Sequence, residues 1–224
     1  MPVRLLQRIP EADLMSDPAQ AQAYAEADFS EPHDRFIELF TNRFGNRLAD
    51  TVLDLGCGPG DICRRFARCF PDCTIHAVDG SMPMLALARK ADLAAGLEQR
   101  IDYFNAYLPD AVLPEKNYSA IISNSLLHHL KSPDTLWKTI QRFSAGNTKI
   151  FIMDLLRPAS TKAAEQLVAK YTDDEPPVLK KDFHNSLLAA YNQEEIQLQL
   201  ETGRLDKLGF EIVSDRHFIV WGSV

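Results

Sequence analysis

Residues 52–61 read Val-Leu-Asp-Leu-Gly-Cys-Gly-Pro-Gly-Asp, and the fold follows from this stretch. A short apolar run over 51–55 ends in three glycines at alternate positions, and a helical pattern begins directly after them. Backbone without side chains turns sharply and approaches a ligand closely, with N–H groups exposed near the start of a helix. The stretch therefore predicts a buried strand, a ligand-binding glycine loop and a helix.

The same alternation of strand and helix continues along the chain. Short apolar runs predict further strands at 74–78, 101–104, 120–123 and 149–154, and helical spacing predicts helices over 62–70, 82–93 and 135–143. Strands separated by single helices indicate βαβ units. The predicted fold is α/β: a doubly wound, mostly parallel sheet with helices on both faces.

Two regions lie outside this alternation. Residues 1–47, with helix formers over 19–29, are predicted to form an N-terminal helical cap segment, and 48–224 the ligand-binding domain. After the fifth strand, 157–207 is mostly helical in pattern, with 157–195 a helical insertion that we expect to serve as a lid. The chain closes with two β-rich pieces at 210–213 and 217–221.

Composition restricts the class of protein. The chain has 224 residues, 25% of them charged, with a formal charge of −7, which opposes nonspecific attraction to nucleic acid. No apolar run approaches the roughly 20 residues that span a bilayer, and no targeting signal is visible, so the cytoplasm is the expected location. The four cysteines form no CxxC pair, so reduced thiols and no metal site are predicted: Cys57, Cys63, Cys69 and Cys73.

The spacing of the glycines separates two classes of ligand. A dinucleotide fingerprint, GxGxxG, has its third glycine where this chain has Asp61. An acidic side chain at the helix entrance would oppose a pyrophosphate. The loop suits a ligand with less negative charge and a cationic end better than it suits NAD.

Residues 54–60, Asp-Leu-Gly-Cys-Gly-Pro-Gly, resemble the DxGxGxG motif of class I (Rossmann-like) S-adenosylmethionine-dependent methyltransferases. Four more segments resemble that family in the same order: 76–79, 105–106, 124–130 and 154–158. The resemblance implies S-adenosyl-L-methionine as cofactor and S-adenosyl-L-homocysteine as product.

The resemblance also implies residue roles. Asp54 would help to hold the ammonium of the methionine moiety and Asp79 the two ribose hydroxyls, while the alternative for either carboxylate is a helix cap. Met84 would pack on the adenine and Asn105, where the family more often has Asp, would meet its edge. The whole implied cofactor site comprises Asp54, Gly56, Cys57, Gly58, Gly60, Asp79, Gly80, Ser81, Met84, Asn105, Ala106, Asn124 and Ser125.

Three residues are candidates for a general base, which an acceptor needs only if it carries a proton: His128, His129 and Asp154. Adjacent histidines leaving a strand point in different directions, so one of them is expected to face the site. The acceptor pocket is predicted to use aromatic side chains outside the matched segments: Tyr24, Phe29, Tyr171, Phe183 and Tyr191. The alternative is that these aromatics only pack a helical layer.

The sequence thus predicts a methyltransferase that acts on a small-molecule acceptor by direct in-line displacement. Two alternatives stay open: methylation of RNA or protein, and a non-catalytic module that only binds S-adenosylmethionine. RNA would require a basic stripe. The conspicuous basic cluster, Arg64, Arg65 and Arg68, is expected to be an exposed helix face. The oligomeric state is not predicted.

Overall fold

The computed structural model describes residues 6–11 and 17–224. Its centre is one seven-stranded sheet with the order β3-β2-β1-β4-β5-β7-β6. The strands are β1 (Asp50–Leu55), β2 (Cys73–Asp79), β3 (Ile101–Asn105), β4 (Ala120–Asn124), β5 (Lys149–Leu155), β6 (Gly209–Ile212) and β7 (His217–Ser223).

The first five strands run parallel, and β7 pairs antiparallel with both β5 and β6. The chain order reverses between β1 and β4, which are neighbours in the sheet. In open parallel sheets a crevice opens at such a reversal, outside the carboxyl ends of the strands. The predicted doubly wound α/β class is confirmed.

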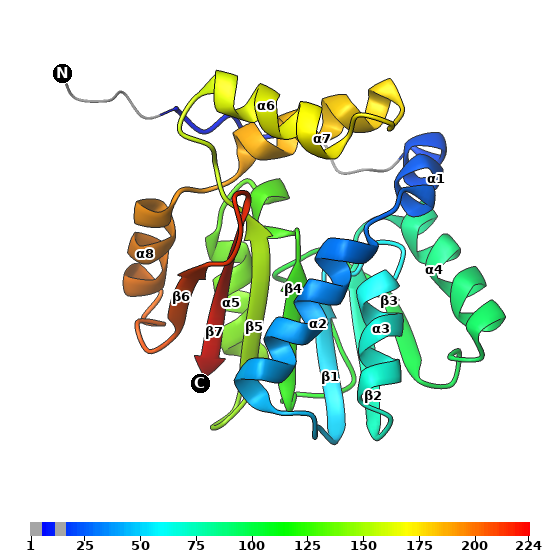
Figure 1. The fold of residues 1–224 in the computed structure, drawn as a ribbon. Helices are drawn as coiled ribbons and strands as arrows, with labels where there is room; N and C mark the ends of the chain where they lie inside the picture. The colour runs from blue at the N-terminus through cyan, green and yellow to red at the C-terminus, as the bar shows by residue number, and fades with distance from the viewer. Residues whose placement is uncertain (1–5, 12–16) are drawn as a thin grey trace.

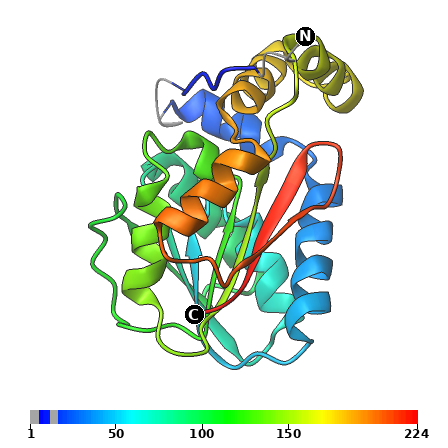
Figure 2. The same ribbon diagram turned by 90° about the vertical axis from the view of Figure 1, so that its left-hand side faces the viewer.

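Helices cover both faces of the sheet (Figures 1 and 2). One face is covered by α2 (Ser30–Phe44), α3 (Asp61–Cys69) and α4 (Met82–Ala95), and the other by α5 (Asp134–Phe143) and α8 (Gln193–Thr202). The spacing of apolar residues explains the packing of α3, whose buried positions fall on one side of the helix. Phe40 of α2 packs edge to face on Phe66 of α3 at 4.9 Å between ring centroids.

A third group of helices lies across the carboxyl ends of the parallel strands: α1 (Pro18–Glu26), α6 (Thr161–Tyr171) and α7 (Pro177–Ala189) (Figure 1). The predicted insertion is therefore helical, and α7 starts at the second of two consecutive prolines, a favoured first position of a helix. No helix among the described residues is both long and apolar enough to cross a bilayer.

The helix formers over 19–29 do not form one continuous helix, because α1 ends at Glu26. The cause is local: Ala27 is extended, and the side chain of Asp28 accepts a hydrogen bond from the Ser30 amide at 2.9 Å where α2 begins. Phe29 consequently lies between two helices, over the carboxyl edge of the sheet. Most other predicted elements differ from the structure by one or two residues at an end, and the division of the chain at residue 47 stays a prediction.

Candidate active site: two adjoining cavities at the carboxyl edge of the sheet

The first cavity, of about 210 Å³, lies where the loops after β1, β2 and β4 converge with α1 and α2. This is the crevice at the reversal of strand order. It is lined by Tyr24, Ala25, Ala27, Asp28, Phe29, Ser30, His33, Asp54, Gly56, Cys57, Gly58, Pro59, Asp61, Ile62, Arg64, Arg65, Asp79, Ser81, Met84, Asn124, Ser125 and His129.

Gly58 and Gly60 have different structural roles in the loop. Gly58 has φ +52°, and a Cβ added there would meet no atom within 4 Å. Gly60 has φ +75°, and a Cβ added there would collide with the Tyr103 hydroxyl. Gly58 thus exposes bare backbone beside the cavity, whereas Gly60 lets the loop pack on β3.

Asp79, at the end of β2, connects the loops. Its Oδ2 accepts from the Gly58 amide at 2.8 Å and its Oδ1 accepts from the Ser81 amide at 2.7 Å. The N-cap of α4 is Ser81, whose side chain accepts from the Met84 amide. The cap is therefore made by Ser81, and Asp79 keeps its carboxylate on the cavity. Burial raises the pKa of Asp79 above its ordinary value.

Asp54, at the end of β1, is the most deeply buried acid of this cavity, with 1% of its surface exposed. Burial raises its pKa to about 7, and the Asp79 charge adds to the rise; the Cys63 thiol, which donates to Oδ2 at 2.9 Å, opposes it. Across the crevice on β4, Asn124 has a buried Oδ1 without a hydrogen-bond partner among the described residues. Ser125 follows with φ +56°, a left-handed conformation uncommon for serine. These oxygens suit a ligand that brings a positive charge or hydrogen-bond donors.

Four predicted cofactor residues lie outside the lining of this cavity: Gly60, Gly80, Asn105 and Ala106. Asn105 is exposed, and its Nδ2 donates to the Asp79 carbonyl at 3.0 Å. Its predicted place at an adenine edge therefore stays a prediction. The other nine predicted cofactor residues all line the cavity.

His33 and Asp61 form a pair that was not predicted from the sequence. Nδ1 of His33 lies 2.7 Å from Oδ2 of Asp61, and both residues line the first cavity. Burial would raise the pKa of Asp61, but hydrogen bonds from His33 and Arg65 hold it well below its usual range. Asp61 thus stays ionised beside the glycine loop. The pair was not recognisable because His33 is 28 residues away in the chain and lies on a helix outside the motif.

The second cavity, of about 290 Å³, adjoins the first below α6 and α7. Residues that line both include Tyr24, Phe29, His33, Asn124, Ser125 and His129. Residues lining only the second are Glu31, Pro32, His128, Leu155, Tyr171, Thr172, Glu175, Leu179, Asp182, Phe183, Ser186, Arg216 and His217.

Four of the five predicted acceptor-pocket aromatics line this second cavity, and Tyr191 does not. Tyr191 is buried, pairs with Leu156 through a β-bridge and packs under the Arg8 guanidinium at 4.2 Å. It supports the base of the insertion. The role of the other four in an acceptor pocket stays a prediction.

The candidate bases occupy different positions. Asp154 is 1% exposed and lines neither cavity; it accepts from Nδ1 of His128 at 2.6 Å and from the Leu127 and Leu155 amides at 2.7 Å. Burial would raise the pKa of Asp154, yet the charge and hydrogen bond of His128 hold it below its ordinary value. Asp154 therefore orients His128 and does not reach the cavities itself.

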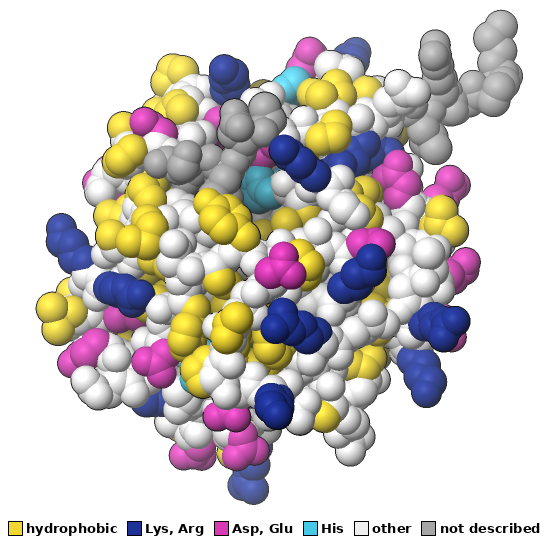
Figure 3. Space-filling model, turned by 180° about the vertical axis from the view of Figure 1, so that it is seen from behind, with side chains coloured by type: hydrophobic (Ala, Val, Ile, Leu, Met, Phe, Trp, Pro, Cys, Tyr) yellow, Lys and Arg dark blue, Asp and Glu magenta, His cyan; other side chains and the backbone are white. Residues whose placement is uncertain are grey.

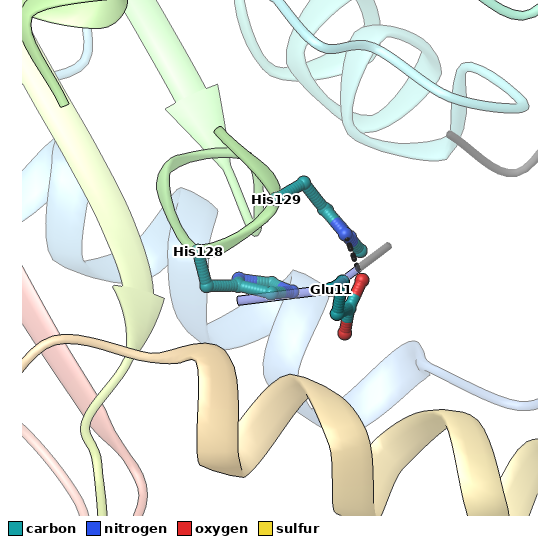
Figure 4. A group of neighbouring side chains, drawn as sticks. All are labelled: Glu11, His128 and His129. Carbon is teal, nitrogen blue, oxygen red and sulfur yellow. Dashed lines mark hydrogen bonds and ion pairs between the residues drawn. The ribbon is translucent and has the colours of Figure 1, made fainter. Parts of the chain in front are cut away.

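His129 lines both cavities and pairs with Glu11, which the sequence analysis did not single out. Nδ1 of His129 lies 2.5 Å from Oε2 of Glu11, and Figure 4 shows His128 turned toward the same carboxylate. Burial would raise the pKa of Glu11, but His129 lowers it to about 2. Burial would lower the pKa of His129, but Glu11 raises it. The two side chains form an ion pair at the junction of the cavities.

Comparison with known proteins bears on the segment that carries the glycine loop. A family model described as "Methyltransferase domain" matches residues 52–147. Over 120 residues the chain is 31% identical to malonyl-[acyl-carrier protein] O-methyltransferase of Priestia megaterium, covering 54% of this chain and 41% of that protein. Over 113 residues it is 34% identical to trans-aconitate 2-methyltransferase of Mycobacterium tuberculosis, covering 50% and 40%. The chain spans about two fifths of the length of these curated relatives.

The likeness in fold extends further than the likeness in sequence. A solved structure described as a putative S-adenosyl-L-methionine-dependent methyltransferase from Methanococcus maripaludis superposes with a TM-score of 0.69 at 23% identity, covering 95% of each chain. Residues 52–147 thus match a methyltransferase domain, and the described chain has the fold of solved structures described as S-adenosyl-L-methionine-dependent methyltransferases.

Proposed function

We propose that this protein transfers a methyl group from S-adenosylmethionine to a small-molecule acceptor by direct in-line displacement. One observation carries the proposal: two cavities meet at the carboxyl edge of the sheet, and each is lined by residues of a different chemical character. The first combines bare backbone with carboxylates, and the second adds aromatic and apolar side chains to a lining that also contains charged and polar ones.

The residues of the first cavity fit the cofactor. Asp54 and the unpartnered Oδ1 of Asn124 offer acceptors for an ammonium group, and Asp79 offers a carboxylate to the ribose hydroxyls. The absence of a side chain at Gly58 leaves open space in which the cofactor can lie against the backbone. When bound, the cofactor supplies a methyl group that its positively charged sulfur makes electrophilic.

The second cavity is the proposed acceptor site. Tyr24, Phe29, Tyr171 and Phe183 give it aromatic surfaces, and α6 and α7 close it from above. In-line attack needs the acceptor atom within roughly 3 Å of the methyl carbon and opposite the sulfur. A cavity continuous with the cofactor site allows that approach, and helices above it exclude water from the transfer.

His129 is the proposed proton acceptor among the three candidates. It lies at the junction, whereas Asp154 is enclosed and His128 lines only the second cavity. Glu11 at Nδ1 fixes the imidazole orientation, in the way a buried carboxylate orients a catalytic histidine. The imidazole acts as a base through Nε2 once the proton on that nitrogen has left, while the Nδ1 proton stays in the hydrogen bond to Glu11.

The names of two relatives bear on the chemical class of the acceptor. Malonyl-[acyl-carrier protein] and trans-aconitate, named for two relatives, both carry carboxylates. Arg216 lines the second cavity, but Glu31, Glu175 and Asp182 also line it. A small acceptor with both polar and apolar parts matches this mixture.

RNA as the acceptor has less support. Arg64 pairs with Asp92, and Arg65 pairs with Asp61 and Asp34, so these two side chains do not form the exposed basic face that the sequence suggests. On the face shown in Figure 3, Lys and Arg side chains are interspersed with Asp and Glu. That distribution lacks the single-sign stripe that RNA binding uses.

The test has two stages. Isothermal titration of the full chain with S-adenosylmethionine and S-adenosylhomocysteine should show saturable binding of both. A panel of small carboxylic acids, phenols and amines is then screened for S-adenosylhomocysteine release that depends on the added compound.

The outcomes separate the alternatives. Acceptor-dependent release from a small molecule supports the proposal. Tight cofactor binding with release only on added RNA or protein favours a macromolecular acceptor, and binding without any release favours a non-catalytic module. Absence of cofactor binding would remove the proposal altogether.

A further inference from the structure

Two imidazoles and one carboxylate meet at the junction of the cavities. Each of Glu11, His128 and His129 offers one ligand atom, and these three atoms lie within 4.8 Å of one another (Figure 4). The two histidines are consecutive on the short 3-10 turn η1 (Leu127–His129), with ring centroids 4.0 Å apart. A proton acceptor uses one imidazole, so the second imidazole in this cluster needs another explanation.

Hydrogen bonds from residues outside the cluster orient its ligand side chains. Asp154 accepts from Nδ1 of His128 at 2.6 Å, which leaves Nε2 of His128 for the cluster. Ser186 of α7 donates to Oε1 of Glu11 at 2.7 Å. Metal-binding histidines and carboxylates commonly have such outer partners, which fix the tautomer and the orientation of the ligand.

The segment that carries Glu11 is fixed at this place. Nε of Arg8 donates to the Ala189 carbonyl at 2.6 Å, and its guanidinium also donates to the His128 carbonyl at 2.9 Å. The Ile9 amide donates to the Leu188 carbonyl at 2.9 Å. These contacts place the Glu11 carboxylate beside the two histidines, which are more than a hundred residues away in the sequence.

We infer that Glu11, His128 and His129 form a binding site for one divalent transition-metal ion, whose open coordination position takes an oxyanion of the methyl acceptor. Two imidazole nitrogens and one carboxylate oxygen suit Zn²⁺, Fe²⁺ or Co²⁺. Three protein ligands leave at least one position open, as catalytic metal sites do. The expectation of no metal site rested on the cysteines alone, whereas these ligands are histidines and a glutamate.

The open position faces the proposed acceptor. His128 and His129 both line the second cavity, and His129 also lines the first. A metal ion there would hold a carboxylate or enolate oxygen beside the transferred methyl group and lower the pKa of that oxygen. It would thereby take over the role proposed above for His129 as a base. The identity of the oxygen ligand rests on the proposed function; metal binding itself does not.

Binding requires a small local rearrangement. Ligand atoms about 2.0–2.2 Å from a tetrahedral ion lie about 3.3–3.6 Å from one another. The Glu11–His129 pair, at 2.5 Å, must open, and no other pair has to close by more than about an ångström, because all three ligand atoms lie within 4.8 Å of one another. The proton shared by Glu11 and His129 leaves to solvent as the metal enters. Rotation of the side chains supplies movements of this size.

The test uses the full chain without a histidine tag, freed of metal with a chelator. Zn²⁺ is titrated calorimetrically and Co²⁺ by its visible absorption, which reports a protein-bound ion. We expect one equivalent of each to bind. Glu11→Gln and His129→Asn should each weaken binding at least tenfold, and Ser186→Ala should weaken it by about tenfold because an outer partner is lost.

Matched controls lie elsewhere on the chain. Glu165→Gln on α6 and His184→Asn on α7 remove the same groups outside the cluster and should leave metal affinity unchanged. Circular dichroism and S-adenosylmethionine binding of the metal-free protein show that each variant is folded and that the cofactor site is intact. They also separate failure of the metal site from failure of the proposed function.

Two results would overturn the inference. Wild-type protein that binds neither ion in a saturable, stoichiometric way has no such site, and any loss of methyl transfer in Glu11→Gln then belongs to a metal-free histidine–glutamate pair. Metal affinity that is unchanged in both Glu11→Gln and His129→Asn places the bound ion elsewhere.

Discussion

Replacement of Asp54 by Asn should change how both stability and cofactor binding depend on pH. Asp54 is 1% exposed, and burial raises its pKa to about 7 from an ordinary 3.8. A pKa rise of about three units means that folding disfavours the ionised form by about 4 kcal/mol relative to the unfolded chain. Asn keeps the shape of the side chain and removes the titration.

The sign follows from proton linkage. The folded pKa lies above the unfolded one, so this contribution to stability is fully present below about pH 4 and is lost as the pH rises through about 7. From pH 4 to pH 8 the free energy of unfolding of the wild type should therefore fall by up to about 4 kcal/mol relative to that of Asp54→Asn. Urea denaturation of both proteins across this range measures the difference.

Cofactor binding gives a second readout of the same group. An ammonium beside Asp54 favours the carboxylate, so S-adenosylmethionine binding at pH 6 should release close to one proton from the wild type. Calorimetry in two buffers of different ionisation enthalpy measures this release, which should be lost in Asp54→Asn and retained in the exposed control Asp110→Asn. If wild type and Asp54→Asn lose stability in parallel with pH and release equal numbers of protons, Asp54 is not the buried, cofactor-linked acid described here.

Three further changes test the first cavity. Asp79→Ala should abolish measurable S-adenosylmethionine binding in calorimetry, because both loop amides and the ribose hydroxyls lose their acceptor; unchanged affinity would remove Asp79 from that role. Gly58→Val should leave a folded protein, by circular dichroism, that no longer binds the cofactor, since the side chain enters open space at a positive φ. Gly60→Ala should instead lower the melting temperature by several degrees because its Cβ meets Tyr103, and equal behaviour of the two glycine variants would contradict the division of roles. NAD should not shift the melting temperature, because Asp61 places negative charge at the start of α3, where a dinucleotide's pyrophosphate would bind; a large stabilisation would instead favour dinucleotide binding.

Sequence reasoning succeeded where the decisive interactions are local. The strand, loop and helix around Gly58 follow from apolar runs and glycine spacing within ten residues, and the acid ending β2 follows from the next βαβ unit. It did not show where the helix formers over 19–29 are interrupted: α1 ends at Glu26, and α2 begins at Ser30. The break depends on the extended backbone at Ala27, which a pattern of helix formers does not reveal.

The roles of side chains within the site were harder to foresee. Gly60 matches the motif as well as Gly58 does, yet it faces Tyr103 on β3. Tyr191 is as aromatic as Tyr171, yet it packs under Arg8. In both cases the residue type is right for a binding site, and only the packing direction distinguishes a lining residue from a supporting one.

The amino-acid sequence alone determined the α/β class, the glycine loop and the carboxylates at the ends of β1 and β2, because periodicity and turn chemistry act over a few neighbouring residues. Only the tertiary structure joined Glu11 to His129, His33 to Asp61, and α6 and α7 to the carboxyl edge of the sheet. These partners are brought together by strand order and by helix packing across the whole chain. Hydrophobic patterning shows which face of an element is buried, but not which distant element covers it.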